Sequence, residues 1–432
     1  MKTPTIPTAS AVGVAALLTL AACAPAESGS SAASTTSPTA SAESHDHAAS
    51  ESEEQAVRTP RLVATYDGGV AIIDANSLDV VSTIDKDGFL RVAAVGDGRH
   101  ATVATDGGWT VLDAGTWSQG HGDHYHYYTA EPMLTDLTID AETPGHVVPH
   151  EGTTTLWDDA TGHATVVEIS EWTDMAEHAH LHPIREYTAP EAHHGVAAVT
   201  EDGQMLVTRG NEDERTGAMV LAADGAEMAV SDECPGVHGE TGFRDADDEH
   251  FFMVGCEDGA LVFHGDHVHK IVNADSPGRT GSLFSSEGSS VVLGDFNDDP
   301  DAGLGLDQIA LYDVASESVS VVKPFGDADA LYTFRGIRRG SDGEALVLGS
   351  DGVLRTIDPA TGEVTVETVV IDAWDVPEEW QTAHPSLTVV DGMAYVTDPA
   401  TESLHIVDYV AGEVWKSAEV GVALNEVTAV TG

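Results

Sequence analysis

Histidine is the residue type in this sequence whose number and spacing could do chemistry. The 432-residue chain contains 21 histidines, more than its 18 lysines and arginines together. His124 and His126 stand at alternate positions, so an extended segment would point both imidazoles to one side. Neutral imidazole is a common metal ligand, and a cluster of such rings suits zinc in a tetrahedral site. The sequence therefore predicts a histidine-rich zinc site.

The elements that must position these histidines are short strands in an internal repeat. A unit made of a turn, a β-rich run, a second turn and another β-rich run recurs along the chain. Repeats with this content and spacing are typical of a β-propeller. We interpret each copy as the outer two strands of a four-stranded blade, and long amphipathic helices are not expected. The copies begin at Asp67, Asp106, Glu151, Thr216, Asp258, Asp307, Asp351 and Thr401.

The predicted fold is an all-β propeller with eight blades, or seven if one degenerate copy is a long insertion. Only the first copy lacks a full pair of inner strands upstream, because RLVATY supplies just one. The chain ends in EVTAVTG, with no outer strands after it. We expect this C-terminal strand to complete the first blade, which would close the ring and remove an exposed sheet edge.

The propeller frame sorts the histidines by face. In this fold the links between blades, and the turns between second and third strands, open on one face, called here the connector face. We place His264, His267 and His269 on the opposite face or rim, in an outer-strand turn. The segments expected on the connector face are 121–128, 177–182, 193–196 and 234–240, together with His384.

Convergence on the connector face predicts the metal ligands. A single histidine there is more often a polar loop residue, or packs against Tyr127 or Tyr128, but several from adjacent blades favour a site. Asp123 or Glu240 could ligate or orient a ring. The expected zinc ligands are His124, His126, His194 and His238, with His121, Asp123 and His193 as further candidates.

The N-terminus indicates an exported lipoprotein. The apolar run 11–20 is too short to span a bilayer and fits the hydrophobic part of a signal peptide. It leads into Leu20-Ala21-Ala22-Cys23, which resembles a bacterial lipobox, with Cys23 as the lipidated residue. The predicted domains are a signal peptide (1–22), a disordered lipid-anchored leash rich in Ala, Ser, Thr, Glu and Pro (23–60), and the propeller (61–432).

The remaining cysteines and the charge limit the function further. With Cys23 assigned to lipid, Cys234 and Cys256 remain as a pair that an oxidising compartment would keep as a disulfide. A Cys-based zinc site would need more cysteines than the chain has. The formal net charge of −55 disfavours nucleic acid and anionic lipid as partners, so we expect membrane contact only through the anchor.

The combination of an exported propeller with the segments GHGDHYHYY, HHGVA and CPGVHGE resembles the AztD family of zinc metallochaperones. This resemblance implies an extracytoplasmic protein that binds Zn²⁺ on the propeller and passes it to the substrate-binding protein of a zinc ABC importer. By this resemblance, the expected ligands of the main zinc site are His124, His126, His194 and His238. The resemblance also implies a weaker site in the N-terminal segment, here at His45 and His47.

Two other functions fit the same residues. A metal-assisted propeller hydrolase or lyase could use a His/Glu pair such as His238 and Glu240. The sequence shows no serine nucleophile motif and no pattern that identifies a substrate, so a non-enzymatic chaperone is the favoured function. A protein-binding scaffold with incidental histidines is the third candidate.

Overall fold

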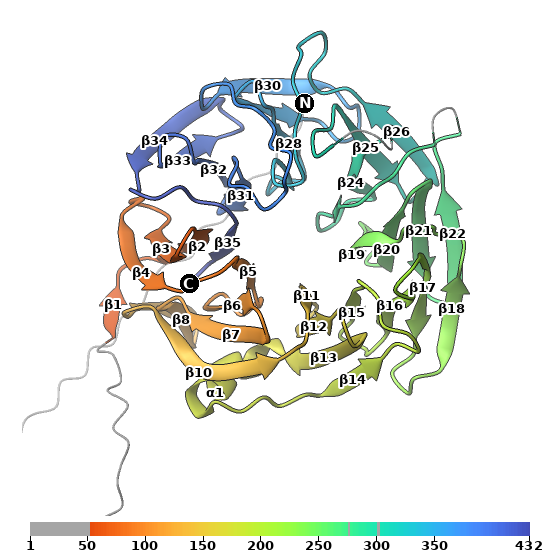
Figure 1. Ribbon diagram of the computed structural model, residues 1–432, viewed down its shortest axis with the longest axis horizontal. Coiled ribbons are helices and arrows are strands. Elements are labelled where there is room, and N and C mark those ends of the chain that lie inside the picture. Colours follow the sequence, from red (N-terminus) through yellow and green to blue (C-terminus); the bar gives the residue numbers. More distant parts are fainter. Residues whose placement is uncertain (1–51, 275–276, 300–302) are drawn as a thin grey trace, which may run out of the picture. The chain divides into compact units, whose positions relative to one another are not determined.

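The computed structural model describes residues 52–274, 277–299 and 303–432. Within these residues the chain forms eight four-stranded antiparallel sheets and one three-stranded sheet. Figure 1 shows the four-stranded sheets set around a common axis. One edge strand of each sheet lies innermost, for example β5, β11, β15, β19 and β35. The predicted fold class, an all-β propeller, is confirmed.

Each four-stranded sheet runs from an inner to an outer strand. Four of the sheets are β35 (Val427–Val430), β2 (Arg61–Tyr66), β3 (Gly69–Asp74), β4 (Val80–Asp85); β5 (Arg91–Ala94), β6 (His100–Thr105), β7 (Gly108–Asp113), β10 (Met133–Asp140); β11 (Pro144–His150), β12 (Thr153–Asp158), β13 (His163–Glu168), β14 (Arg185–Thr188); and β15 (Ala197–Val199), β16 (Met205–Gly210), β17 (Arg215–Leu221), β18 (Glu227–Ser231).

The other four sheets follow the same order. They are β19 (His238–Arg244), β20 (His250–Cys256), β21 (Gly259–His264), β22 (His267–Ile271); β23 (Leu283–Phe284), β24 (Val291–Phe296), β25 (Gln308–Asp313), β26 (Ser318–Val322); β27 (Ile337–Arg339), β28 (Ala345–Leu348), β29 (Val353–Ile357), β30 (Val364–Val369); and β31 (Leu387–Val390), β32 (Met393–Asp398), β33 (Ser403–Asp408), β34 (Glu413–Glu419).

The two ends of the described body share one sheet. Strand β35 pairs antiparallel with β2, with Arg61 opposite Val430 and Ala64 opposite Val427. The apolar core lies between neighbouring sheets, and the sheet of β35 and β2 also packs against its neighbour through buried apolar side chains. Leu62 and Ile73 from it pack with Leu404 of the preceding sheet in one buried cluster. Backbone pairing therefore joins the C-terminal strand to the first blade, and side-chain packing joins this blade to the last one.

Two blades depart from the predicted strand assignment. In the sheet of β5, the segment after β7 leaves the blade, and the fourth strand is β10. The departing segment forms the hairpin β8 (Thr116–His121) and β9 (His124–Thr129), which pairs with β1 (Glu53–Gln55). Burial explains this choice, because β10 offers the buried side chains of Leu137 and Ile139, whereas β8 is exposed after Trp117.

In the next sheet the repeat beginning at Glu151 supplies strands two and three rather than three and four. The inner strand is β11, and the long segment after β13 stays inside the blade. That segment contains a 3₁₀ turn (Ile169–Glu171) and α1 (Trp172–His178). Trp172 is fully buried and its indole N–H donates to the Thr154 hydroxyl at 2.8 Å, which holds the helix against the blade.

These two differences in strand assignment change the face of the propeller on which two histidine-containing segments lie. Successive strands in an antiparallel blade run in opposite directions, so the link between strands three and four lies at the end away from the connector face. The segments 121–128 and 177–182 are both in such links. Their predicted place on the connector face is therefore wrong.

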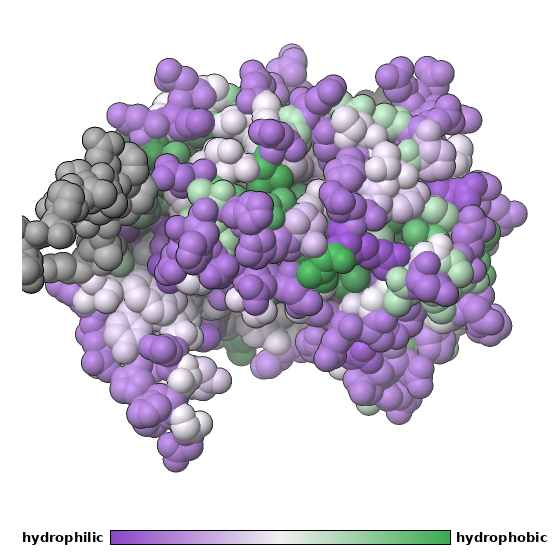
Figure 2. All heavy atoms as spheres, turned by 90° about the horizontal axis from the view of Figure 1, so that it is seen from below, coloured by the Kyte–Doolittle hydropathy of each residue, from purple (hydrophilic) through white to green (hydrophobic). Residues whose placement is uncertain are grey.

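The surface of the body is mostly hydrophilic, as Figure 2 shows for one side. Among the described residues, no helix is long and apolar enough to cross a membrane. Cys23, His45 and His47 lie outside the described residues.

Candidate metal centre

Three histidines from three neighbouring blades meet at the connector face. His146 lies near the start of β11, His194 lies in the link before β15, and His238 is the first residue of β19. Each offers a ring nitrogen, and these three atoms lie within 4.8 Å of one another. The Nε2 atoms of His194 and His238 are 3.1 Å apart. We call this group the three-His centre.

Two of the three rings in the three-His centre are oriented by hydrogen bonds at Nδ1, and the third has a carboxyl group nearby. The Nδ1 of His194 lies 2.6 Å from Oδ2 of Asp159, and the Nδ1–H of His238 donates to the Gly281 carbonyl at 2.6 Å. The Nδ1 of His146 lies 3.7 Å from Oε2 of Glu240. Partners of this kind fix the tautomer of a histidine and leave Nε2 free as a metal ligand.

Burial favours the neutral form of two rings of the centre, His146 and His238. It lowers the pKa of His238 from 6.5 to about 4, and it lowers that of His146 well below 6.5. The neighbouring imidazoles add repulsion with the same sign. Burial also raises the pKa of Glu240 to about 8. At neutral pH both rings are therefore in the unprotonated form that a metal ion requires.

The centre opens into a cavity on the axis of the propeller. This cavity has a volume of about 430 Å³, and His146, His238 and Glu240 contribute to its wall. Arg91 and Arg335 line the same space. Three protein ligands beside an open cavity leave a coordination position for water or for an incoming ligand.

A second histidine group lies on the hairpin of β8 and β9. His121 and His124 are paired across the two strands, and one ring nitrogen from each of His121, His124 and His126 lies within 4.8 Å of the others. The Nε2 atoms of His124 and His126 are 3.1 Å apart. His126 also contacts Glu54 of β1, Nδ1 to Oε1, at 2.6 Å. We call this group the hairpin cluster.

The expected ligands are thus divided between two groups. His194 and His238 are in the three-His centre, while His124 and His126 are in the hairpin cluster with His121. Asp123 lies at the tip of the hairpin, fully exposed, with Oδ1 3.3 Å from Nδ1 of His124. His193 is buried, and its ring contacts the Glu191 carbonyl and the Thr208 hydroxyl, so it points away from the centre.

His146 was not among the expected ligands. Its strand, PGHVVPH, contains Pro144 and Pro149 and follows a repeat whose fourth strand differs from the prediction, so the sequence pattern does not identify it as an inner strand. The signal in the sequence that identifies this inner strand is its position just before the next strand of the blade. An inner strand must precede Thr153–Asp158, and its first residues lie at the connector face.

The predicted disulfide is present between Cys234 and Cys256. Cys234 lies in the link before β19, and Cys256 is the last residue of β20. Both are fully buried. Because Cys234 precedes His238 by four residues, the bridge anchors the segment that delivers this ligand.

Comparison with known proteins adds an independent observation. No family model matches the sequence. The zinc chaperone AztD of Citrobacter koseri is 25% identical over 388 residues, which cover 86% of this chain and 86% of that protein. This chain resembles AztD over most of its length. The resemblance that the histidine and cysteine motifs indicate is confirmed.

Solved structures of AztD have the same fold. The crystal structure of Citrobacter koseri AztD matches with a TM-score of 0.72 and 23% identity, covering 87% of this chain and 99% of that one. Its apo structure matches with a TM-score of 0.71 and 22% identity, covering 87% and 98%. The dihydro-heme d1 dehydrogenase NirN is more distant, with a TM-score of 0.53, 12% identity and coverage of 88% and 76%.

Proposed function

We propose that this protein is an extracytoplasmic zinc chaperone that binds Zn²⁺ at the three-His centre and passes it to the substrate-binding protein of a zinc ABC importer. The observation that carries the proposal is the convergence of three oriented imidazoles beside an open cavity. The likeness to the zinc chaperone AztD supports it.

Zinc would move by ligand exchange. The protein supplies three nitrogen ligands, so an incoming imidazole or carboxylate can bind before any protein ligand leaves. Zinc suits such an exchange because it has no d-electron preference for one geometry. Nothing in this step requires a bond to be made or broken in an organic substrate.

The hairpin cluster and the tail histidines belong to the same proposal as secondary zinc sites. The hairpin cluster is more exposed than the three-His centre, with 56% of the His124 side chain accessible. Fewer outer partners fix its rings, so we expect it to bind zinc more weakly. The pair His45 and His47 would form the weakest site.

The proposed location follows from Cys23. A lipid on this residue would hold the propeller on the outer face of the cytoplasmic membrane. The residues between Cys23 and β1 would act as the leash, which is shorter than the predicted 23–60 because β1 pairs with β9. Tethering both chaperone and receptor to one membrane raises their effective concentration. Replacing Cys23 by Ala should shift the protein from the membrane fraction to the soluble fraction.

The test is a zinc titration followed by a transfer assay. We expect His238→Ala and His146→Ala to weaken zinc binding strongly, and the control His163→Ala to leave it unchanged. His163 contacts the Thr188 hydroxyl and belongs to neither histidine group. Zinc-loaded protein mixed with the apo form of the cognate receptor should transfer zinc faster than zinc dissociates spontaneously. Transfer no faster than dissociation would contradict a chaperone.

A metal-assisted hydrolase or lyase is the second candidate, and Glu240 favours it. This buried carboxyl group lies beside His146, and its raised pKa, about 8, would suit a general acid. If this candidate is correct, Glu240→Gln should abolish turnover of a substrate while zinc stays bound.

A further inference from the structure

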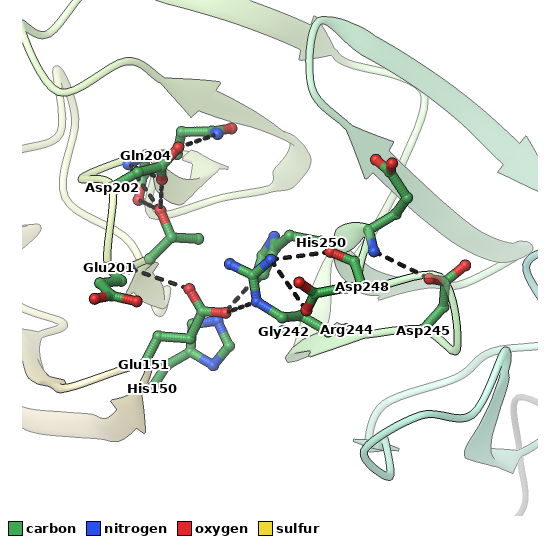
Figure 3. A network of polar contacts seen from close by, with 12 residues as sticks. His150, Glu151, Glu201, Asp202, Gln204, Gly242, Arg244, Asp245, Asp248 and His250 are labelled. Carbon is green, nitrogen blue, oxygen red and sulfur yellow. Dashed lines mark hydrogen bonds and ion pairs between the residues drawn. The ribbon is translucent and has the colours of Figure 1, made fainter.

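A third group of side chains that could hold a metal ion lies at the other end of two of the three blades of the three-His centre. His150 is the last residue of β11, and His250 is the first residue of β20. Their Nε2 atoms are 2.9 Å apart. Glu151 follows His150, and its carboxylate lies within 4.8 Å of a nitrogen from each ring. Figure 3 shows the three side chains among their polar neighbours.

This group is distinct from the three-His centre. His146 and His150 are four residues apart on β11, so their Cα atoms are about 13 Å apart along an extended strand. On the blade of β19, two blades further along the chain, His238 begins β19, whereas His250 follows the turn at the far end of this strand. Zinc–nitrogen bonds are about 2 Å long, so one ion cannot serve both groups.

The carboxylate of Glu151 is held in place by two contacts. Arg244 Nε–H donates to its Oε1 at 2.7 Å, and the Glu201 backbone N–H donates to its Oε2 at 3.1 Å. Each carboxylate oxygen has two lone pairs, so each can still bind a metal ion. Glu151 also has a φ of 38°, a left-handed conformation that is uncommon for a residue with a side chain.

The ring of His150 is fitted against a glycine. A Cβ atom at Gly242 would lie 2.5 Å from both Cε1 and Nε2 of this ring. The Phe252 ring, paired with Gly242 across β19 and β20, also packs here, with its centroid 5.8 Å from that of His150 and 4.6 Å from that of His250. Contacts with Gly242 and Phe252 therefore restrict both imidazoles while their Nε2 atoms face each other.

We propose that His150, His250 and Glu151 form a separate site for a divalent transition-metal ion at the face opposite the three-His centre. Two imidazoles and one carboxylate suit Zn²⁺, Co²⁺ or Ni²⁺. Two nitrogen ligands on a tetrahedral zinc ion are about 3.3 Å apart, so the observed 2.9 Å needs only a small opening to accept the ion. Arg244 positions the carboxylate, and its own charge weakens the site relative to the three-His centre.

The direct test is crystallographic. Crystals of the full chain grown with zinc should show an anomalous peak at the zinc edge between the Nε2 atoms of His150 and His250, within bonding distance of both. No peak there, at a zinc concentration that fills the three-His centre and the hairpin cluster, would overturn the proposal. In that case the two rings share one proton, and the group is only a contact between blades.

A solution test uses matched variants and counts bound ions by equilibrium dialysis. His250→Gln should lose one bound ion per chain relative to the unsubstituted protein, and the control His163→Gln should lose none. Gly242→Ala should lower the affinity of the same site without removing a ligand, because its Cβ displaces the His150 ring.

An unchanged ion count in a folded His250→Gln protein would refute the site. This outcome is independent of the proposed zinc transfer. His238→Ala should keep this ion while it loses the one at the three-His centre, and His250→Gln should still transfer zinc to the receptor.

Discussion

At the scale of single residues, the three-His centre depends on what stands behind each ring. Asp159, the Gly281 carbonyl and Glu240 are chemically different, yet each faces the Nδ1 of a different imidazole. The two hydrogen-bonded partners, Asp159 and the Gly281 carbonyl, leave the Nε2 atoms of His194 and His238 facing each other. If the centre holds zinc as proposed, the ligands and their hydrogen-bond partners act as one unit, and a change in a partner should change the metal affinity.

The first prediction concerns Asp159. Asp159→Asn keeps the size of the side chain but removes the charge that orients His194, so zinc affinity should fall about 10–100-fold. Competition with a chromophoric zinc chelator measures the change. The control is His193→Gln, next in sequence to His194, because its buried ring points elsewhere. It should lower thermal stability and leave zinc affinity unchanged, and equal losses of affinity in both variants would contradict the assigned geometry.

The second prediction concerns pH. The pKa of His238 is about 4 in the folded protein and 6.5 in an unfolded chain. Between these values the unfolded chain binds a proton that the folded protein does not, so the stability of the zinc-free protein should fall as the pH drops from about 6.5 to about 4. His146 contributes with the same sign. Unfolding midpoints in denaturant measure this slope, and it should be shallower in His238→Gln. A variant with the full slope would contradict the assignment.

Two of the three histidines that meet in the three-His centre could be predicted from the sequence. His194 and His238 follow from the motifs HHGVA and CPGVHGE, each placed just before an inner strand. His146 could not be found in this way, because a lone histidine between prolines carries no motif. The four expected ligands fall into two separate groups, His194 with His238 and His124 with His126. Which histidines come together depends on which strands pair, and the spacing of histidines in the sequence does not determine strand pairing.

At the scale of elements, burial decides which segments become blade strands. The segments after β7 compete for the outer position, and both β8 and β10 have β-forming residues. Leu137 and Ile139 alternate on β10 and are buried, whereas the later residues of β8 are polar. Counting turns locates a strand pair, but only the alternation of apolar residues distinguishes a blade strand from an inserted hairpin.

The third prediction concerns the disulfide, which joins a connector to the end of β20. Cys234 and Cys256 are 22 residues apart, and a cross-link closing a loop of this size stabilises a protein by about 3 kcal/mol. The double variant Cys234→Ala, Cys256→Ala should unfold at lower denaturant by this amount. Zinc affinity should also fall, because the link that carries His238 becomes freer.

Reduction of the unsubstituted protein provides the control for the disulfide. Dithiothreitol should reproduce both effects without creating the cavities that alanine leaves. A reduced protein with unchanged stability and zinc affinity would show that packing, and not the bridge, holds this link.

At the scale of the whole molecule, the ring depends on its last strand. Strand β35 is the inner strand of the sheet that also contains β2, β3 and β4, so chain ends more than 360 residues apart share one ladder. Val430 is 1% exposed and belongs to the cluster that includes Val63 and Ile72. The composition of EVTAVTG and the incomplete first repeat predict this role, since a propeller blade requires four strands.

The fourth prediction is therefore that deleting residues 427–432 has a far larger effect than its length suggests. The truncation removes four backbone pairings, uncovers the edge of β2 and opens one cluster of the core to water. An exposed β-edge promotes association between chains. Circular dichroism melting and light scattering should show a large drop in thermal midpoint, with aggregation.

The matched control deletes residues 1–51 at the opposite terminus. This longer deletion removes nothing from the eight four-stranded sheets, so the midpoint should stay close to that of the full chain. If the protein without 427–432 melted cooperatively at the same temperature as the control, the remaining blades would be stable without the shared sheet. Zinc binding would then be expected to survive, because the residues of the three-His centre lie in other blades.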